Sequence, residues 1–265
     1  MTPVELIRGT GPIVLGLPHT GTYVPDNIDS ALNERGQTLA DTDWHIECLY
    51  NGLLDNATTV RATFHRYVID ANRDPQGHSL YPGQNTTGLV PLTDFDGVPI
   101  WTDPPGPKEI ETRRQRFHAP YHAALQAELT RVHATHGIAI LYDCHSIRSQ
   151  IPYLFDGTLP DFNIGTNQGT TCAPEIEAAI ADICAHADGY TSVSNGRFKG
   201  GWTTRHYGQP SRNIHAIQME LAQSTYLAAE STPWTYDEVK AARLRTHLIA
   251  IQSSMIEVAK ELKIA

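Results

Sequence analysis

Cysteines are few in this sequence, and none of them belongs to a familiar metal or redox motif. The four cysteines, Cys48, Cys144, Cys172 and Cys184, form no C-x-x-C pair, which excludes a zinc ribbon and a thioredoxin-like motif. A chain of 265 residues can bury a large core without disulfides, so we expect reduced thiols. The sequence has no signal-peptide pattern, and no apolar run approaches the roughly 18 residues of a membrane-spanning helix. We therefore expect a cytoplasmic protein.

Positive charge is also scarce. The chain has 20 Lys and Arg residues against 29 Asp and Glu residues, which gives a formal net charge of -9. A net-acidic chain is a poor nonspecific ligand for nucleic acids and for anionic membranes, so neither is expected as a partner. A small anionic substrate requires a local cluster of cations. The sequence leaves the oligomeric state open.

The sequence lacks the GxSxG, GxxxxGK and GxGxxG motifs, but it contains short apolar runs that alternate with helical patterns. Strands are expected at 12–17, 58–64, 138–142 and 214–221, and helices at 44–54, 109–136, 174–187 and from 235 to the C-terminus. The helix at 109–136 is expected to break or to start again near Pro120. This alternation predicts an α/β sheet in a single domain, residues 1–265. The segment 74–107, rich in Gly, Pro, Asn, Thr and Asp, is expected to be an ordered covering loop.

Three residues with catalytic chemistry lie at the ends of apolar strands. His19 ends the run IVLGLPHTG, His145 ends IAILYDCHS, and Glu220 lies near the end of IHAIQMELAQ. Histidines that converge at one sheet edge are typical zinc ligands, and a catalytic zinc needs a nearby carboxylate as base. The alternatives are that each histidine is an ordinary loop residue and that Glu220 is paired with a buried arginine.

The segment RYVIDANRDP carries groups suited to a carboxylate. Asn72 and Arg73 follow a strand-like apolar stretch. The planar guanidinium of an arginine matches a carboxylate in two hydrogen bonds, and an asparagine adds another donor. The alternative is that Arg73 forms a structural ion pair with Asp70 or Asp74.

The segment SNGRFKGGWTTRHYGQP combines glycines with basic and aromatic residues. Its glycines predict a flexible or tightly turning loop. Because the whole chain is acidic, the cations Arg197, Lys199 and Arg205 indicate a site for a small anion more than a nucleic-acid surface. A solvated β-hairpin is the alternative.

Taken together, these segments resemble the N-formylglutamate amidohydrolase family. The matching segments occur in the family's order from about residue 13 to residue 227: PHTGTYVP, LADTDWHIECLY, VIDANRDP, YDCHSI, PDFNIGTNQGTTC, NGRFKGGWTTRHYG and MELAQSTYL. The resemblance implies a three-layer α/β/α sandwich around a mixed sheet, similar to zinc carboxypeptidases and aspartoacylases. It also implies hydrolysis of N-formyl-L-glutamate to formate and L-glutamate, a step of histidine degradation, with one divalent metal ion, zinc being the first expectation.

The resemblance also implies which residues hold the metal. His19 and His145 match the family's two metal histidines. Zinc carboxypeptidases place an acidic ligand three residues after the first histidine, where this chain has Thr22. The third ligand is therefore expected to be Asp43, with Asp41 as the alternative.

The resemblance implies roles in catalysis and substrate binding as well. Glu220 matches the catalytic glutamate, a general base that later acts as the acid. Asn72 and Arg73 match the pair that holds a substrate carboxylate. Arg205, in the glycine-rich segment, is expected as a second anchor and as a catalytic cation, with Arg148 and Arg197 in reserve.

Two other functions stay open at this stage. The chain can remove a different acyl group from another N-acyl amino acid or peptide, which a panel of such substrates distinguishes. It can also be a non-catalytic binder of acidic metabolites, in which case the metal-free protein would bind glutamate.

Overall fold

Seven strands form one mixed sheet in the computed structural model, which describes residues 1–79 and 83–264. The strand order is β1-β3-β2-β4-β7-β5-β6. β3, β2, β4 and β7 run parallel to one another, whereas β1 pairs antiparallel with β3 and β5 pairs antiparallel with β7. The strands are β1 (Val4–Ile7), β2 (Ile13–Leu17), β3 (Thr58–Ala62), β4 (Ala139–Ile147), β5 (Phe162–Gly165), β6 (Ser192–Ser194) and β7 (Ile214–Ala222).

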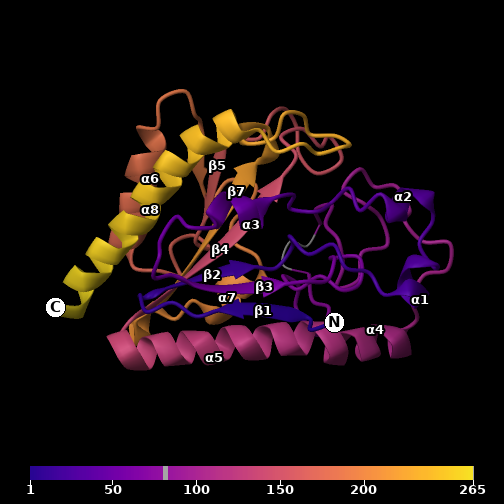
Figure 1. Cartoon of the computed structure of the whole chain (residues 1–265), viewed down its shortest axis with the longest axis horizontal. Helices are drawn as coiled ribbons and strands as arrows, with labels where there is room; N and C mark the ends of the chain where they lie inside the picture. The colour runs from indigo at the N-terminus through magenta and orange to yellow at the C-terminus, as the bar shows by residue number, and fades with distance from the viewer. Residues whose placement is uncertain (80–82, 265) are drawn as a thin grey trace.

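Helices cover both faces of this sheet (Figure 1). On one face, α4 (Pro107–Arg113) continues through the π-helical segment η1 (Arg114–His118) into α5 (Ala119–His136). The other face is covered by α3 (Ile46–Tyr50), α6 (Pro174–Ala185) and α8 (Glu238–Ile264). The shorter elements are α1 (Asp26–Asp29), α2 (Glu34–Gln37), α7 (Trp202–Tyr207) and the 3-10 turns η2 (Pro210–Arg212) and η3 (Gln223–Thr225). These three layers confirm the predicted α/β/α sandwich.

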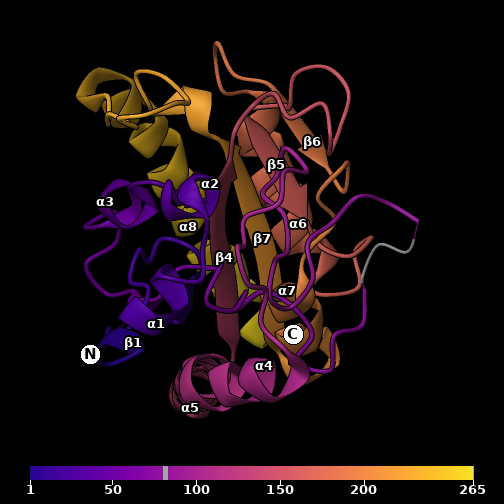
Figure 2. The same cartoon turned by 90° about the vertical axis from the view of Figure 1, so that its right-hand side faces the viewer.

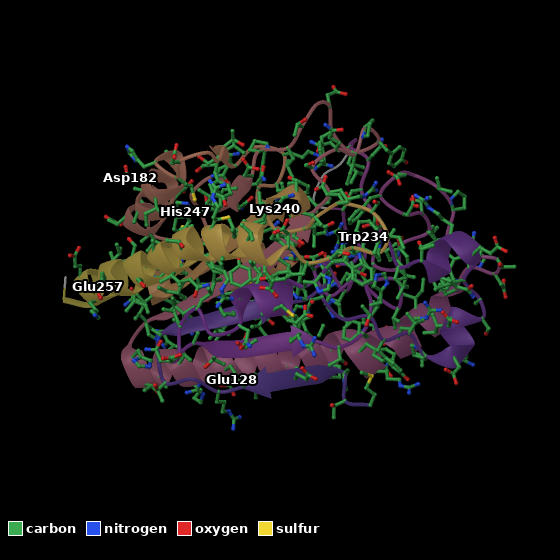
Figure 3. The ribbon with its side chains drawn as sticks, turned by 45° about the horizontal axis from the view of Figure 1, so that its top comes forward. Glu128, Asp182, Trp234, Lys240, His247 and Glu257 are labelled. Atoms are coloured by element: carbon green, nitrogen blue, oxygen red, sulfur yellow. The ribbon has the colours of Figure 1, made fainter. Side chains whose placement is uncertain are left out.

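The side chains of the central strands alternate between two cores. On β4, Ile140 and Tyr142 pack beneath α6 and α8, whereas Ala139 and Leu141 pack toward α5. Figure 3 shows the same division, with Glu128 of α5 on the opposite side of the sheet from His247 of α8. Because both faces are covered, the central strands are almost continuously buried, and this burial explains why the apolar runs at 12–17 and 138–142 predicted them correctly.

Several boundaries differ from the sequence-based predictions. β4 extends to Ile147, because its polar residues also are buried and pair with β7. The helix predicted over 44–54 is only one turn long, and Gly52 with φ of 69° lies just beyond it. Pro120 does not break the helical region, because the wider turns of η1 precede it. The short strands β1, β5 and β6, and helix α7 in the glycine-rich segment, were not predicted.

Two further expectations concern membrane-spanning helices and the covering loop. Among residues 1–79 and 83–264, no helix combines the length and the apolar character that crossing a membrane requires. Of the predicted covering loop, residues 80–82 lie outside the described residues.

Candidate active site

The chemistry-bearing side chains of the two central strands lie on the same face of the sheet. β4 and β7 run side by side through the middle of the molecule (Figure 2), with Asp143 opposite Gln218 and His145 opposite Glu220. Side chains two residues apart on a strand share a face, so these four residues all point away from α6 and α8. Gln218 and Glu220 therefore mark the active-site face of β7, whereas His215 lies on the opposite face.

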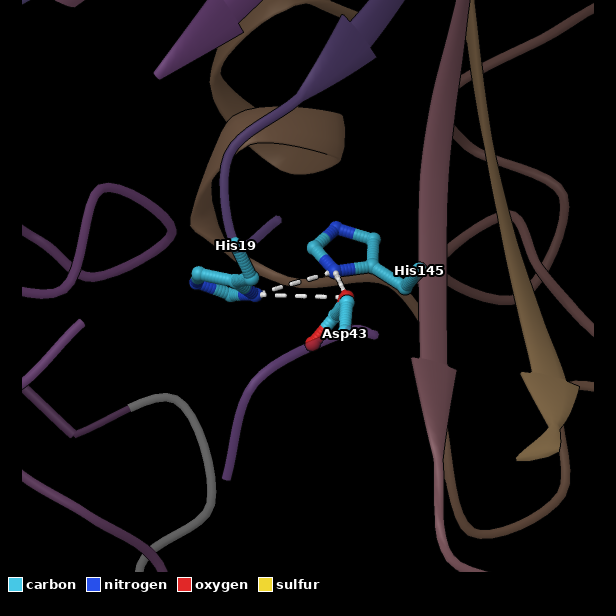
Figure 4. A group of neighbouring side chains, drawn as sticks. All are labelled: His19, Asp43 and His145. Carbon is cyan, nitrogen blue, oxygen red and sulfur yellow. Dashed lines mark hydrogen bonds and ion pairs between the residues drawn. The ribbon is translucent and has the colours of Figure 1, made fainter. Parts of the chain in front are cut away.

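His145 meets two residues from loops at the carboxyl ends of the strands (Figure 4). His19 follows β2, and Asp43 precedes α3. The Nδ1 atoms of the two histidines are 3.1 Å apart. Oδ2 of Asp43 lies 3.8 Å from Nδ1 of His19 and 3.4 Å from Nδ1 of His145. All three side chains are buried, and they form a group that could hold a metal ion.

The outer nitrogen of each histidine faces a second carboxylate. Nε2 of His19 is 2.7 Å from Oδ1 of Asp70, and Nε2 of His145 is 3.1 Å from Oδ1 of Asp143. An ionised carboxylate only accepts hydrogen bonds, so Nε2 of His19 carries a proton and its Nδ1 presents a lone pair inward. Metal-binding histidines in proteins have this arrangement, in which an outer carboxylate orients the ring.

The two histidines differ in their protonation. Burial, together with the nearby Arg66, lowers the pKa of His19 to about 4. Burial by itself would also lower the pKa of His145, but the Asp143 and Asp43 carboxylates raise it well above its ordinary value. The carboxylates around His145 thus favour positive charge at the centre of the group.

A divalent cation fits the same position. Two nitrogens bound at about 2.0–2.1 Å to a tetrahedral zinc lie about 3.3 Å apart, close to the 3.1 Å between His19 Nδ1 and His145 Nδ1. Two neutral imidazoles and one carboxylate form the donor set of many catalytic zinc sites, which leave a further position for water. The residues present therefore suit a metal of this class.

The structure separates the two alternatives for the acidic ligand. Asp43 lies beside both histidines, whereas Asp41 accepts a hydrogen bond of 2.9 Å from the backbone N–H of Phe95 and is not part of the group. Thr22, at the position where carboxypeptidases carry their acidic ligand, is exposed. The geometry therefore favours Asp43.

A second group of metal-ligand types lies near the surface at the start of α3. It consists of His45, Glu47 and Cys48. Nε2 of His45 donates a hydrogen bond of 2.8 Å to the Trp234 carbonyl, and Cys48 is exposed. None of the three lines the cavity described next, so this group does not share a site with Glu220.

The buried metal-ligand group opens into a cavity that also contains arginines and the predicted base. The covering loop contributes four of its residues, which supports the prediction that this segment lies over a site. The lining residues are His19, Arg66, Asn72, Arg73, Asn85, Thr86, Thr87, Phe95, His145, Ser146, Ile147, Leu154, Arg197, Phe198, Gly201, Gln218 and Glu220.

Glu220 is buried beside the histidines and has the acidity of a general base. Its side chain lies in the cavity wall, and its Oε2 accepts a hydrogen bond of 2.9 Å from Nε2 of Gln218. Burial raises the pKa of Glu220 to about 7, with His145 opposing the shift and Asp43 adding to it. A carboxylate with a pKa near neutrality can both accept and return a proton.

Asn72 and Arg73 both reach the cavity. Oδ1 of Asn72 accepts a hydrogen bond of 2.9 Å from the Thr203 N–H. Arg73 donates from Nε to the Thr87 carbonyl and from Nη2 to the Thr87 hydroxyl, each at 2.9 Å. Its Nη1 is 3.9 Å from Oδ2 of Asp70, so the structural ion pair considered from the sequence is a long one.

The other arginines differ in their access to the cavity. Arg197 lines it and donates to the carbonyl oxygens of Leu154 and Asn85, each at 3.0 Å. Arg205 and Arg148 are not among the lining residues; Nε of Arg205 donates to the Gly200 carbonyl at 2.8 Å. Arg205 does not line the cavity, so the anchoring and catalytic roles expected of it stay predictions.

Arg66 is a site residue that the sequence reading missed. It is buried, lines the cavity, and donates from Nη2 to Oδ1 of Asp43 at 2.7 Å. Its guanidinium carbon lies 4.9 Å from the centre of the Phe95 ring, and its Nε has no hydrogen-bond partner among the described residues. The only sequence feature that could have indicated Arg66 is its position directly before an apolar run, in RYVIDANRDP.

Comparison with known proteins identifies the family. Residues 11–227 match the sequence profile of a family described as N-formylglutamate amidohydrolase. The chain belongs to this family. It is 44% identical over 259 residues to an N-formylglutamate deformylase of Pseudomonas aeruginosa, with 96% of each chain covered. It is 47% identical over 234 residues to an N-formylglutamate deformylase of Pseudomonas putida, with 87% of each chain covered.

Two solved structures share this fold, one of them an N-formylglutamate amidohydrolase. The enzyme from Ralstonia eutropha JMP134 superposes with a TM-score of 0.80 at 25% identity and covers 99% of both chains. A gene product of Agrobacterium tumefaciens matches with a TM-score of 0.74 at 14% identity, covering 97% of this chain and 96% of that one. The resemblance inferred from the sequence segments is thus confirmed, as is the hydrolase class that it implied.

Proposed function

We propose that the protein hydrolyses N-formyl-L-glutamate to formate and L-glutamate, and that it does so with one divalent cation, Zn²⁺, held by His19, Asp43 and His145. Relatives named N-formylglutamate deformylase support the substrate. The observation that carries the proposal is a single cavity lined by His19 and His145 of this group, by Glu220 and by three arginines.

The residues of the chain divide the chemistry among them. When bound, the cation lowers the pKa of water and polarises a carbonyl oxygen. Glu220 accepts a proton from the water as the water oxygen adds to the formyl carbon. Arg66 contributes positive charge where the formyl oxygen becomes negative. Glu220 then returns the proton to the amine nitrogen as the C–N bond breaks.

The substrate has two carboxylates, and the cavity offers cations for both. Arg73, with Asn72, is proposed to hold one carboxylate through paired hydrogen bonds. Arg197 is proposed to hold the other, because it lines the same cavity. Arg205 stays the second choice for this anchor.

The experiment that tests the function is formate release from N-formyl-L-glutamate by the purified protein, before and after chelation and with Zn²⁺ restored. We expect release to stop on chelation and to return with the metal. Glu220→Gln should keep metal and substrate binding but lower kcat by about 10²–10⁴-fold, the usual contribution of a general base.

Each part of the proposal has its own contrary outcome. Full release by protein shown to be metal-free would remove the cation from the mechanism. No release with any divalent cation would point to another N-acyl amino acid, which a panel of substrates would identify. Binding of glutamate by the metal-free protein without any turnover would favour a binding protein.

A further inference from the structure

The glycine-rich segment, expected from the sequence to be a flexible or tightly turning loop, is a tight turn against the active site. Gly200 has φ of 103°, a conformation that favours glycine, and α7 begins directly after Gly201. Two backbone N–H groups of this turn donate into the site. Gly201 N–H donates to Oε1 of Gln218 at 2.6 Å, and Thr203 N–H donates to Oδ1 of Asn72 at 2.9 Å.

These two donors decide which way each side-chain amide points. An amide group has an oxygen that accepts and a nitrogen that donates, whereas a backbone N–H can only donate. The turn therefore binds the oxygen end of both amides, and for Gln218 this leaves the NH₂ end facing Glu220. Nε2 of Gln218 donates a hydrogen bond of 2.9 Å to Oε2 of Glu220.

The turn has no room to relax this arrangement. Gln218 is 4% exposed, and Thr203 is completely buried. A Cβ added at Gly201 would collide with the Asn72 amide, so the close approach depends on a glycine. The side-chain amide of Gln218 is thus hydrogen-bonded to the turn at its oxygen and to Glu220 at its nitrogen.

We propose that Gln218 is a positioning residue for Glu220. Held at its oxygen end by the Gly201 N–H just before α7, Gln218 restrains Oε2 of the Glu220 carboxylate and leaves Oε1 for proton transfer. The inference rests on the proposed role of Glu220, and it gives the glycine-rich segment the task of orienting the base.

The test replaces Gln218 with methionine, which has a similar length and no amide. Gln218→Met should lower kcat by about 10–100-fold, because a misplaced catalytic group costs rate even when binding is intact. KM for N-formyl-L-glutamate should stay within about threefold, and metal content should not change. Gln252→Met is the matched control, since Gln252 is also fully buried but lies on α8 and outside the cavity; it should keep the wild-type kcat.

A double substitution separates positioning from a merely structural effect. If Gln218 acts through Glu220, then Gln218→Met should change kcat by less than about twofold in the Glu220→Gln background. A structural effect would instead lower kcat by the same factor in both backgrounds, which would overturn the proposal. If Gln218→Met does not fold, Gln218→Leu takes its place, because leucine is also apolar and offers no donor to Glu220; its kcat should fall in the same way.

The controls also distinguish this inference from the proposed function. If the wild type releases no formate, or Glu220→Gln keeps its kcat, the proposed function fails. If both behave as expected and the Gln218 variants keep kcat within about twofold of the wild type, only the positioning role is wrong.

Discussion

At the scale of single residues, Asp41 and Asp43 show how surroundings separate two identical side chains. They lie two positions apart and both are buried. Burial raises the pKa of Asp41 to about 7. Burial would raise the pKa of Asp43 too, but Arg66 and the two histidines lower it below its ordinary value. Asp43 is therefore an ionised carboxylate that faces the histidines, as a metal ligand requires.

This difference predicts the outcome of two matched substitutions. Asp43→Asn should weaken zinc binding at least about tenfold, because it removes one anionic ligand, whereas Asp41→Asn should keep the metal. Zinc retained after dialysis against a competing chelator measures both, with thermal unfolding as a check on folding. Loss of zinc from Asp41→Asn and its retention in Asp43→Asn would reverse the ligand assignment.

At the scale of elements, the turn at Gly200 and Gly201 separates the two arginines of the glycine-rich segment. Arg197 precedes the turn and lines the cavity between the Leu154 and Asn85 carbonyls. Arg205 follows the turn and lies in α7, where its Nε donates back to the Gly200 carbonyl. Arg197 and Arg205 thus have different surroundings, although they are near each other in the sequence.

This arrangement predicts unequal effects of removing the two cations. Arg197→Ala should raise KM for N-formyl-L-glutamate about tenfold or more, since a charged hydrogen bond to a substrate carboxylate contributes roughly 1.5–3 kcal/mol. Arg205→Ala should raise it much less. Steady-state kinetics of the two variants decide between them, and the opposite order would make Arg205 the anchor.

At the scale of the whole molecule, the mixed sheet gathers segments that are far apart in the sequence. His19 follows β2, and Glu220 lies on β7 near the other end of the chain. Because one sheet carries both and both helical layers pack on it, we propose that residues 1–265 form a single domain. The same burial that builds this core also encloses ionisable groups that have no part in the site.

His215, at the start of β7, makes the free energy of unfolding depend on pH. Its Nδ1 accepts a hydrogen bond of 3.1 Å from Ala173 N–H at the start of α6. Burial lowers its pKa to about 4, with Glu175 opposing the shift. Between about pH 6.5 and pH 4 the unfolded chain therefore binds a proton that the folded chain excludes. The contribution of His215 to stability is present at neutral pH and is lost as the pH falls through this window.

We predict that the difference in free energy of unfolding between the wild type and His215→Asn changes with pH. The asparagine oxygen can still accept from Ala173 N–H, but it does not titrate. From about pH 7.5 to about pH 5.5, the free energy of unfolding of the wild type should fall relative to the variant by on the order of 1 kcal/mol. Denaturant unfolding at both pH values measures it, and an unchanged difference would contradict it.

The sequence alone determined the central strands, the layered fold, and the positions of His19, His145 and Glu220. Strands covered on both faces are continuous apolar runs, and reactive groups at their carboxyl ends meet at one edge of the sheet. These are properties of local composition and of general sheet geometry. They can be inferred from the sequence without knowing which segments are in contact.

The tertiary structure alone placed Asp43, and not Asp41, beside the two histidines, brought Arg66 into the cavity, and set Gly201 against Gln218. Each of these outcomes depends on a contact between residues distant in the chain, such as Arg66 with Asp43 or Gly201 with Gln218. Local pattern marks a residue as polar or basic, but its pKa and its hydrogen-bond partners follow from the groups that folding packs around it.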